Sequence, residues 1–177
     1  MTTLFINGSP RKHGNTATLG TRLLRDLDHT TIHLTDYRLN FEQDQRETNR
    51  PQVDRSDDFE SLMALVRAND TLVLGTPVYW YGMTGQLKVF MDRWFDSYTA
   101  NFPFANKRIY LLVVGADQPE TKATGITQSV RDSCEWLQMD FRGTVTVTAD
   151  AADDVANLSQ LPATFARIRN EIGRQLE

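Results

Sequence analysis

The chain of 177 residues contains only one cysteine, Cys134, and no long apolar run. A single cysteine excludes an intramolecular disulfide and any cluster held by cysteines of this chain alone. No apolar stretch is long enough to span a bilayer, so we expect no membrane partner. The N-terminus runs directly into a strand-like segment without signal-peptide architecture, which favours a cytoplasmic location.

The chain also lacks an excess of charge of either sign. Lysine and arginine number 19 against 23 aspartate and glutamate residues, which gives a formal net charge of -4. This balance argues against a general nucleic-acid-binding protein, although one loop can still bind a phosphate. The length fits one domain, which we expect to cover residues 1–177.

Apolar runs alternate with segments of helical apolar spacing along the whole chain. The runs predict strands at residues 2–7, 30–36, 71–75, 108–114 and 141–148. The spacing predicts helices at 16–27, 57–69 with Ser56 as N-cap, 85–98, 124–139, and a last one from Asp153 or Asp154 that Pro162 delays or kinks.

Five strands alternating with five helices predict an α/β fold with three layers, in which helices cover both faces of a parallel sheet. We predict the flavodoxin-like strand order 2-1-3-4-5, which places ligands outside the carboxyl ends of the first and third strands. The polar segment 37–57 is predicted to be a long surface loop.

The loop from Gly8 to Thr16 leaves the first strand and opens the first helix, where backbone N–H groups and the helix dipole favour an anion. The dinucleotide fingerprint does not fit, because Gly8 and Gly14 are too far apart and no glycine lies between them. The triphosphate P-loop does not fit, because Asn15 stands where that motif has lysine. A phosphatase thiolate is excluded because the loop has no cysteine. The pattern indicates a monophosphate site; the alternative is a plain strand-to-helix turn with a polar cap.

A second loop, residues 76–84, places three aromatic side chains in a row after the third strand: Tyr79, Trp80 and Tyr81. Contiguous exposed apolar surface of this kind usually marks a binding site. Pro77 stiffens the loop and Gly82 permits a close backbone approach, so a flat heteroaromatic ring would find stacking and hydrogen-bonding partners there. The alternative is that these aromatic residues pack under a helix or in a subunit contact.

The segments 8–16, 75–80 and 85–93 together resemble the NAD(P)H-dependent FMN reductase branch of the flavodoxin-like superfamily. The resemblance implies FMN as cofactor and NAD(P)H as co-substrate. It places the FMN phosphate on the first loop, the isoalloxazine beside the second loop, and the loop after the fourth strand next to the ring. The implied cofactor-binding residues are Ser9, Arg11, Lys12, Gly14, Asn15, Thr16, Pro77, Val78, Tyr79, Trp80, Gly82, Gly115 and Asp117. Iron–sulfur flavoproteins carry a cysteine motif in the region corresponding to residues 38–56, where this chain has no cysteine.

The resemblance implies a ping-pong cycle, in which NAD(P)H reduces the flavin and a quinone, nitro compound, azo compound or free flavin accepts the electrons. We assign no catalytic acid or base. His13 is expected to be solvated or to face the phosphate, Asp117 to be a turn residue, and Asp92 and Arg93 to lie on an exposed helix face. A flavodoxin-type electron carrier and a non-enzymatic binding protein remain open alternatives.

Relatives in this branch form dimers that complete the flavin pocket, so a homodimer or homotetramer is expected. The side chains expected to be exposed for this contact are Met83, Trp94, Phe95 and Tyr98. Neither the acceptor nor the choice between NADH and NADPH follows from the sequence.

Overall fold

The computed structural model describes residues 2–42 and 56–176, so residues 43–55 of the predicted long loop lie outside the described part. Five parallel strands form one sheet in the order β2-β1-β3-β4-β5, which confirms the predicted topology. The strands are β1 (Thr3–Asn7), β2 (Thr30–His33), β3 (Thr71–Pro77), β4 (Arg108–Gly115) and β5 (Asp140–Thr148).

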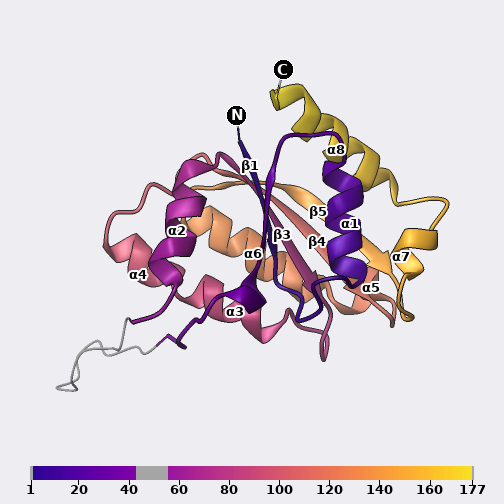
Figure 1. Ribbon diagram of the computed structural model, residues 1–177, viewed down its shortest axis with the longest axis horizontal. Coiled ribbons are helices and arrows are strands. Elements are labelled where there is room, and N and C mark those ends of the chain that lie inside the picture. The colour runs from indigo at the N-terminus through magenta and orange to yellow at the C-terminus, as the bar shows by residue number, and fades with distance from the viewer. Residues whose placement is uncertain (1, 43–55, 177) are drawn as a thin grey trace.

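Helices cover both faces of this sheet (Figure 1). On one face lie α1 (Asn15–Leu24), α7 (Asp154–Asn157) and α8 (Ala163–Leu176). On the other face lie α2 (Phe59–Ala68), α3 (Gly85–Asp92), α4 (Trp94–Thr99) and α6 (Thr124–Trp136). Two short elements, the 3₁₀ helix η1 (Leu34–Asp36) and α5 (Pro119–Lys122), follow β2 and β4. Within the described ranges, no helix combines the length and apolar character needed to cross a membrane.

The inner strands β1, β3 and β4 send alternate side chains into two separate hydrophobic cores. In β1, Leu4 and Ile6 join the core under α2, α3 and α6, whereas Phe5 joins the core under α1 and α8. The central strands β3 and β4 follow the same alternation, and nearly all of their side chains are buried. This is the burial expected of parallel strands covered on both faces, and it leaves only the strand ends free to carry polar loops.

Several predicted element boundaries are wrong. The predicted strand over residues 30–36 ends at His33, and Leu34–Asp36 form the 3₁₀ helix η1 instead. The predicted helix over residues 85–98 is two helices. The break lies at Arg93, whose carbonyl accepts from the Asp96 N–H, three residues later, at 3.1 Å. The predicted effect of Pro162 on the last helix is confirmed: α7 ends at Asn157 and α8 begins directly after Pro162, whose ring and missing N–H are incompatible with a helix interior. Ser56 is not the N-cap of α2; the N-cap is Asp58, and Asp57 accepts from the Phe59 N–H at 3.1 Å.

The expected exposure of Trp94 is also wrong. Its side chain is 3% exposed and packs against Phe90 and Phe104, with ring centroids 5.7 and 6.0 Å apart. The helical spacing from Leu87 onward turns Trp94 inward, toward the same core. Phe95 and Tyr98 of α4 are exposed as expected.

Candidate functional site

The loop after β1 is fixed by backbone contacts that only glycine permits. The Gly8 N–H donates to the Gly75 carbonyl at 2.8 Å. A Cβ at Gly8 would lie 2.8 Å from Leu87 Cβ and 3.0 Å from the Gly75 oxygen, so a larger residue would force the loop away from β3 and α3. Gly8 therefore determines where the loop starts.

Two buried threonines join this first loop to the second. The Thr84 hydroxyl donates to the Gly8 carbonyl at 2.7 Å and accepts from the Leu87 N–H at 3.3 Å as the N-cap of α3. The Thr84 N–H donates to Thr76 Oγ1 at 3.0 Å. Sequence reasoning missed both threonines as positioning residues, although a threonine directly before Gly85 is a recognisable N-cap signal.

The first turn of α1 has the features of an anion site. Its N-cap is Gly14, no side chain caps it, and no acidic residue lies in its first turn. Arg11 is exposed, and its guanidinium has no hydrogen bond or ion pair within residues 2–42 and 56–176. Ser9 is buried, and its Oγ accepts from the Arg11 N–H at 3.1 Å. Free N–H groups, a helix dipole and an unpaired cation together favour a phosphate.

Two of the predicted phosphate-site residues have protein partners elsewhere. Lys12 forms an ion pair with Asp36 of η1. The Asn15 amide reaches the segment between β5 and α7, where it donates to the Ala151 carbonyl at 2.8 Å, and α7 itself, where it accepts from the Val155 N–H at 3.1 Å. The structure thus uses the side chain of Asn15 to hold α1 against the loop after β5.

Behind the loop, Asn7 and His33 form a support that sequence reasoning did not identify. The fully buried Asn7 accepts from the Ser9 N–H at 3.0 Å through Oδ1, and its Nδ2 lies 3.0 Å from His33 Nδ1. Burial is the main cause that lowers the pKa of His33; Lys12 and His13 lower it further, whereas Asp36 opposes the shift. The signal that could have indicated Asn7 is a polar residue at the end of an otherwise apolar strand.

The second loop forms a tight hairpin. Tyr79 and Gly82 exchange two backbone hydrogen bonds of 3.0 Å, and Trp80 and Tyr81 occupy the turn with φ of 50° and 62°. Two positive φ values are typical of a type I′ turn, which favours Asn-Gly. Trp80 is 96% exposed. Bulky residues in this conformation are strained, and strain of this kind is concentrated at functional sites.

The third loop is tied to this hairpin through Asp117. Its carboxylate accepts from Lys122 at 2.6 Å and from the Tyr81 hydroxyl at 3.0 Å. These hydrogen bonds, that from Lys122 foremost, lower the pKa of Asp117. Between the two loops lies an open cavity of about 210 Å³. Its lining residues are Val78, Trp80, Tyr81, Gly115, Ala116, Asp117 and Pro119.

The structure therefore brings Val78, Trp80, Gly115 and Asp117 together around one cavity. Tyr79 and Gly82 form the base of the hairpin instead. A Cβ at Gly82 would meet only the Tyr79 oxygen, at 3.6 Å, so the protein itself does not fill the space in front of this glycine.

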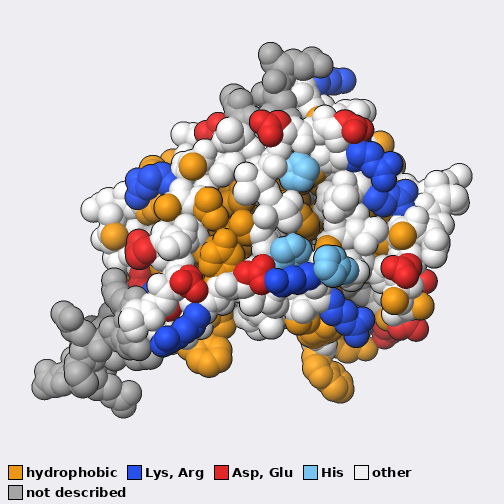
Figure 2. All heavy atoms as spheres, viewed as in Figure 1, with side chains coloured by type: hydrophobic (Ala, Val, Ile, Leu, Met, Phe, Trp, Pro, Cys, Tyr) orange, Lys and Arg blue, Asp and Glu red, His pale blue; other side chains and the backbone are white. Residues whose placement is uncertain are grey.

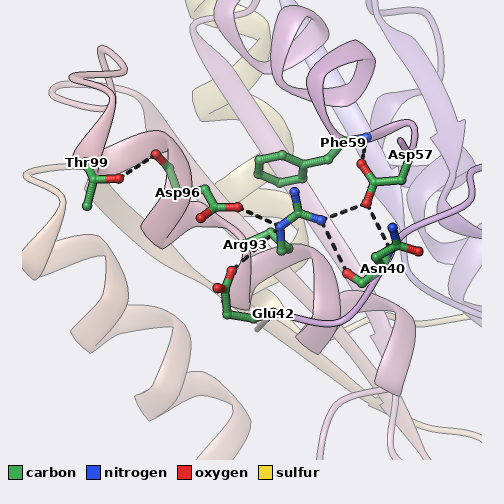
Figure 3. Close-up of polar contacts among 7 residues, drawn as sticks. All are labelled: Asn40, Glu42, Asp57, Phe59, Arg93, Asp96 and Thr99. Carbon is green, nitrogen blue, oxygen red and sulfur yellow. Dashed lines mark hydrogen bonds and ion pairs between the residues drawn. The ribbon is translucent and has the colours of Figure 1, made fainter. Parts of the chain in front are cut away.

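Arg93 is not on an exposed helix face, contrary to the sequence-based expectation (Figure 3). Its side chain is 2% exposed, donates to Asp57 at 2.7 Å and to Asp96 at 2.9 Å, and lies 3.6 Å from a carboxylate oxygen of Glu42. Its guanidinium also lies over the ring of Phe59. Asp92, by contrast, is partly exposed and pairs with Lys88 on the outer face of α3.

This chain is similar in sequence to a family of flavin enzymes and in fold to solved structures. The family model for NADPH-dependent FMN reductases matches residues 1–154. YwqN of Bacillus subtilis, named as an NAD(P)H-dependent FMN-containing oxidoreductase, is 28% identical over 169 residues, which are 92% of this chain and 93% of that protein. An iron-sulfur flavoprotein of Methanocaldococcus jannaschii is 31% identical over 137 residues, 72% of this chain and 69% of that protein. The solved structure of a Trp repressor binding protein from Bacillus subtilis has a TM-score of 0.70 and 26% identity, with 99% of both chains covered.

Proposed function

Because the chain belongs to the NADPH-dependent FMN reductase family, we propose that its three loops bind FMN and present it to NAD(P)H and to an oxidised acceptor. The protein is an NAD(P)H-dependent FMN reductase, with FMN as its cofactor. Bound FMN would supply the redox chemistry that links the nicotinamide donor to the acceptor. The chain's own residues bind and orient the cofactor and its two substrates.

The first loop fits the phosphate of FMN. The observation that carries the proposal is the uncapped start of α1, which has no acidic residue in its first turn and lies beside Arg11, whose guanidinium has no partner among residues 2–42 and 56–176. The backbone N–H groups of the first turn and the Ser9 hydroxyl provide donors of the type that phosphate accepts. Lys12 and Asn15 contribute through charge and backbone position, because their side chains contact Asp36, Ala151 and Val155.

The second and third loops fit the isoalloxazine. The cavity between them is lined by Val78 and Trp80 on one side and by Gly115 on the other. A Cβ at Gly115 would lie 2.8 Å from Val78 Cγ2, so glycine allows the two loops to approach this closely. The apolar lining and the nearby backbone amides suit a flat heteroaromatic ring.

Both substrates are proposed to react at the open side of this cavity. The acceptor is proposed to be a quinone, a nitro or azo compound, or free flavin. No side chain of the site is assigned as a catalytic acid or base. Asp117 is held as a carboxylate by Lys122 and Tyr81, so its role is to position the hairpin.

The test is the visible spectrum of the purified protein with FMN, recorded anaerobically before and after addition of NADH or NADPH. We expect a flavin spectrum that one donor bleaches, and NAD(P)H oxidation with menadione faster than with free FMN alone. Arg11→Ala should raise the Kd for FMN about 10- to 100-fold, as expected for a charge-assisted contact. Arg174→Ala, an exposed arginine in the last turn of α8 and away from the three loops, is the matched control. An unchanged Kd for Arg11→Ala would remove this residue from the site.

We also propose that the chain assembles into a homodimer or homotetramer. The support is a group of exposed aromatic side chains on α4 and α6, namely Phe95, Tyr98 and Trp136, which line an open cavity of about 380 Å³. Exposed aromatic clusters of this kind mark interaction surfaces. Light scattering at micromolar concentration tests the proposal, and a monomeric mass would contradict it.

A further inference from the structure

The buried amide of Asn7 lies between the phosphate loop and β2, and its orientation is fixed. The Ser9 N–H can only donate, so the Asn7 atom that faces it at 3.0 Å must be the oxygen. The Asn7 NH₂ group therefore faces His33 Nδ1, at 3.0 Å. Because an NH₂ group only donates, His33 Nδ1 must accept. The ring is neutral in this arrangement, with its proton on Nε2.

Burial and the neighbouring cations oppose protonation of His33, whereas Asp36 favours it. Lys12 and His13 face it from the phosphate loop, and Arg22 and Arg25 of α1 line the same open cavity of about 570 Å³. Asp36 of η1 is the carboxylate that faces His33 and is itself paired with Lys12. Figure 2 shows histidine side chains next to lysine or arginine and a carboxylate near the middle of the face in view.

We propose that His33 is a positioning residue for the phosphate loop, and that its neutral imidazole is the state that holds this loop ready for a phosphate. The proposal rests on the proposed function in one respect, namely that the loop binds the FMN phosphate. A proton taken from solvent onto Nδ1 would face the Asn7 NH₂ group, and two donors cannot pair. If the amide rotates to accept this proton, its NH₂ group faces the Ser9 N–H instead, and the loop loses its buried anchor.

The effect of His33 protonation is transmitted to Arg11 through Ser9. The Ser9 N–H is held by Asn7, and the Ser9 hydroxyl accepts from the Arg11 N–H at 3.1 Å. Loss of the first hydrogen bond therefore frees the segment that carries the unpaired guanidinium. Protonation of His33 also has an effect that favours phosphate binding, because an imidazolium attracts a bound phosphate. That attraction acts across an open cavity, where solvent screens it, whereas the Asn7 side chain is fully buried.

The first test measures the Kd for FMN by fluorescence quenching between pH 8 and pH 5.5 in the wild-type protein and in His33→Gln. Glutamine offers an uncharged acceptor to Asn7 at every pH. The FMN phosphate itself titrates near pH 6, so the quantity compared is the ratio of the two Kd values at each pH. We expect this ratio to change in favour of His33→Gln toward pH 5.5, by less than about tenfold, because one proton on a group whose pKa lies below its usual value of about 6.5 can shift a Kd by no more than that at pH 5.5. His29→Gln, at the opposite end of β2, should follow the wild type.

The second test needs no FMN. In ¹⁵N NMR spectra of the unliganded protein at pH 7.5, His33 should be the Nε2–H tautomer, and the backbone amides of Ser9 and Arg11 should shift as His33 titrates. These shifts should be absent in His33→Gln. Asn7→Asp should raise the pKa of His33, because a carboxylate then faces Nδ1.

Three results would overturn the proposal. They are a ratio of the wild-type and His33→Gln Kd values that does not depend on pH, an Nδ1–H tautomer of His33, and a Ser9 amide shift that does not change as His33 titrates. If these amide shifts occur but Arg11→Ala leaves the Kd for FMN unchanged, the result contradicts the proposed function and not the role of His33.

Discussion

The Thr84 hydroxyl donates a 2.7 Å hydrogen bond to the Gly8 carbonyl, which lies 76 positions earlier in the chain. The same oxygen caps α3 by accepting from the Leu87 N–H. One buried side chain thus joins the loop proposed to hold the phosphate to the helix that follows the aromatic loop. The relative position of the two halves of the proposed FMN site depends on this contact.

Replacing Thr84 by valine should therefore affect stability and FMN binding together. Valine has nearly the same shape but leaves the Gly8 carbonyl and the first turn of α3 without their partner. Unsatisfied buried groups cost about 1–3 kcal/mol, so we expect a loss of that size in the free energy of unfolding and a higher Kd for FMN. Thr84→Ser keeps the hydroxyl and is the control. Urea unfolding and fluorescence titration measure the two effects; a valine variant that matches the serine variant in both would contradict the assignment.

Arg93→Met should destabilise the protein strongly. Arg93 and Asp57 are both buried and 2.7 Å apart, so removal of the guanidinium leaves the Asp57 carboxylate without its cation. Breaking a buried pair in this way costs about 3–5 kcal/mol. Lys88→Met, which breaks the exposed pair with Asp92 on the neighbouring helix, should cost less than about 1 kcal/mol. Similar urea midpoints for the two variants would contradict the importance of the buried pair.

The Arg93–Asp57 ion pair also predicts how the stability of the protein depends on pH. Burial alone would raise the pKa of Asp57, but hydrogen bonds from the Asn40 N–H, Arg93 and the Phe59 N–H outweigh it and lower that pKa. Because the pKa is lower in the folded state, the stabilisation is present above the unfolded value of about 3.9 and is lost as the pH falls through the folded value. Asp57→Asn should therefore have a lower Tm than wild type at pH 7, and the difference should shrink below about pH 4. A difference that stays constant down to pH 3 would contradict this linkage.

The sheet order was predictable because its signals are local and repeated. Continuous apolar runs such as Leu72–Leu74 identify strands buried on both faces, and the alternation with helical spacing leaves few topologies. The positions of the three polar loops followed from the strand ends alone. Cys134 is buried in α6, and burial raises the pKa of its thiol to about 12, as expected for an unreactive cysteine.

Partners of polar side chains were not predictable, because they lie far away in the sequence. Asn7 contacts His33, 26 positions away, and Asn15 contacts Ala151, 136 positions away. Arg93 follows an amphipathic pattern that places it on the outer face of its helix. Only the tertiary structure shows that residues near Asn40 and Asp57 cover that face. Residue type and spacing carry no signal for such pairs.

The strained hairpin leads to a last prediction, in which stability and binding change in opposite directions. Replacing Trp80-Tyr81 by Asn-Gly supplies the residues that a type I′ turn favours and removes two bulky side chains from positive φ. A non-glycine residue in the left-handed region costs about 1–2 kcal/mol, so we expect an increase of about 1–2 kcal/mol in the free energy of unfolding.

The same double variant should bind FMN more weakly, because it loses the Trp80 ring that lines the cavity and the Tyr81 hydroxyl that reaches Asp117. Gln138→Gly relieves a positive φ of 56° outside the three loops and serves as the control; it should gain stability without a change in the Kd for FMN. Urea unfolding of the FMN-free proteins and fluorescence titration with FMN separate the two effects. Unchanged FMN affinity in the double variant would contradict a contribution of the strained aromatic turn to FMN binding.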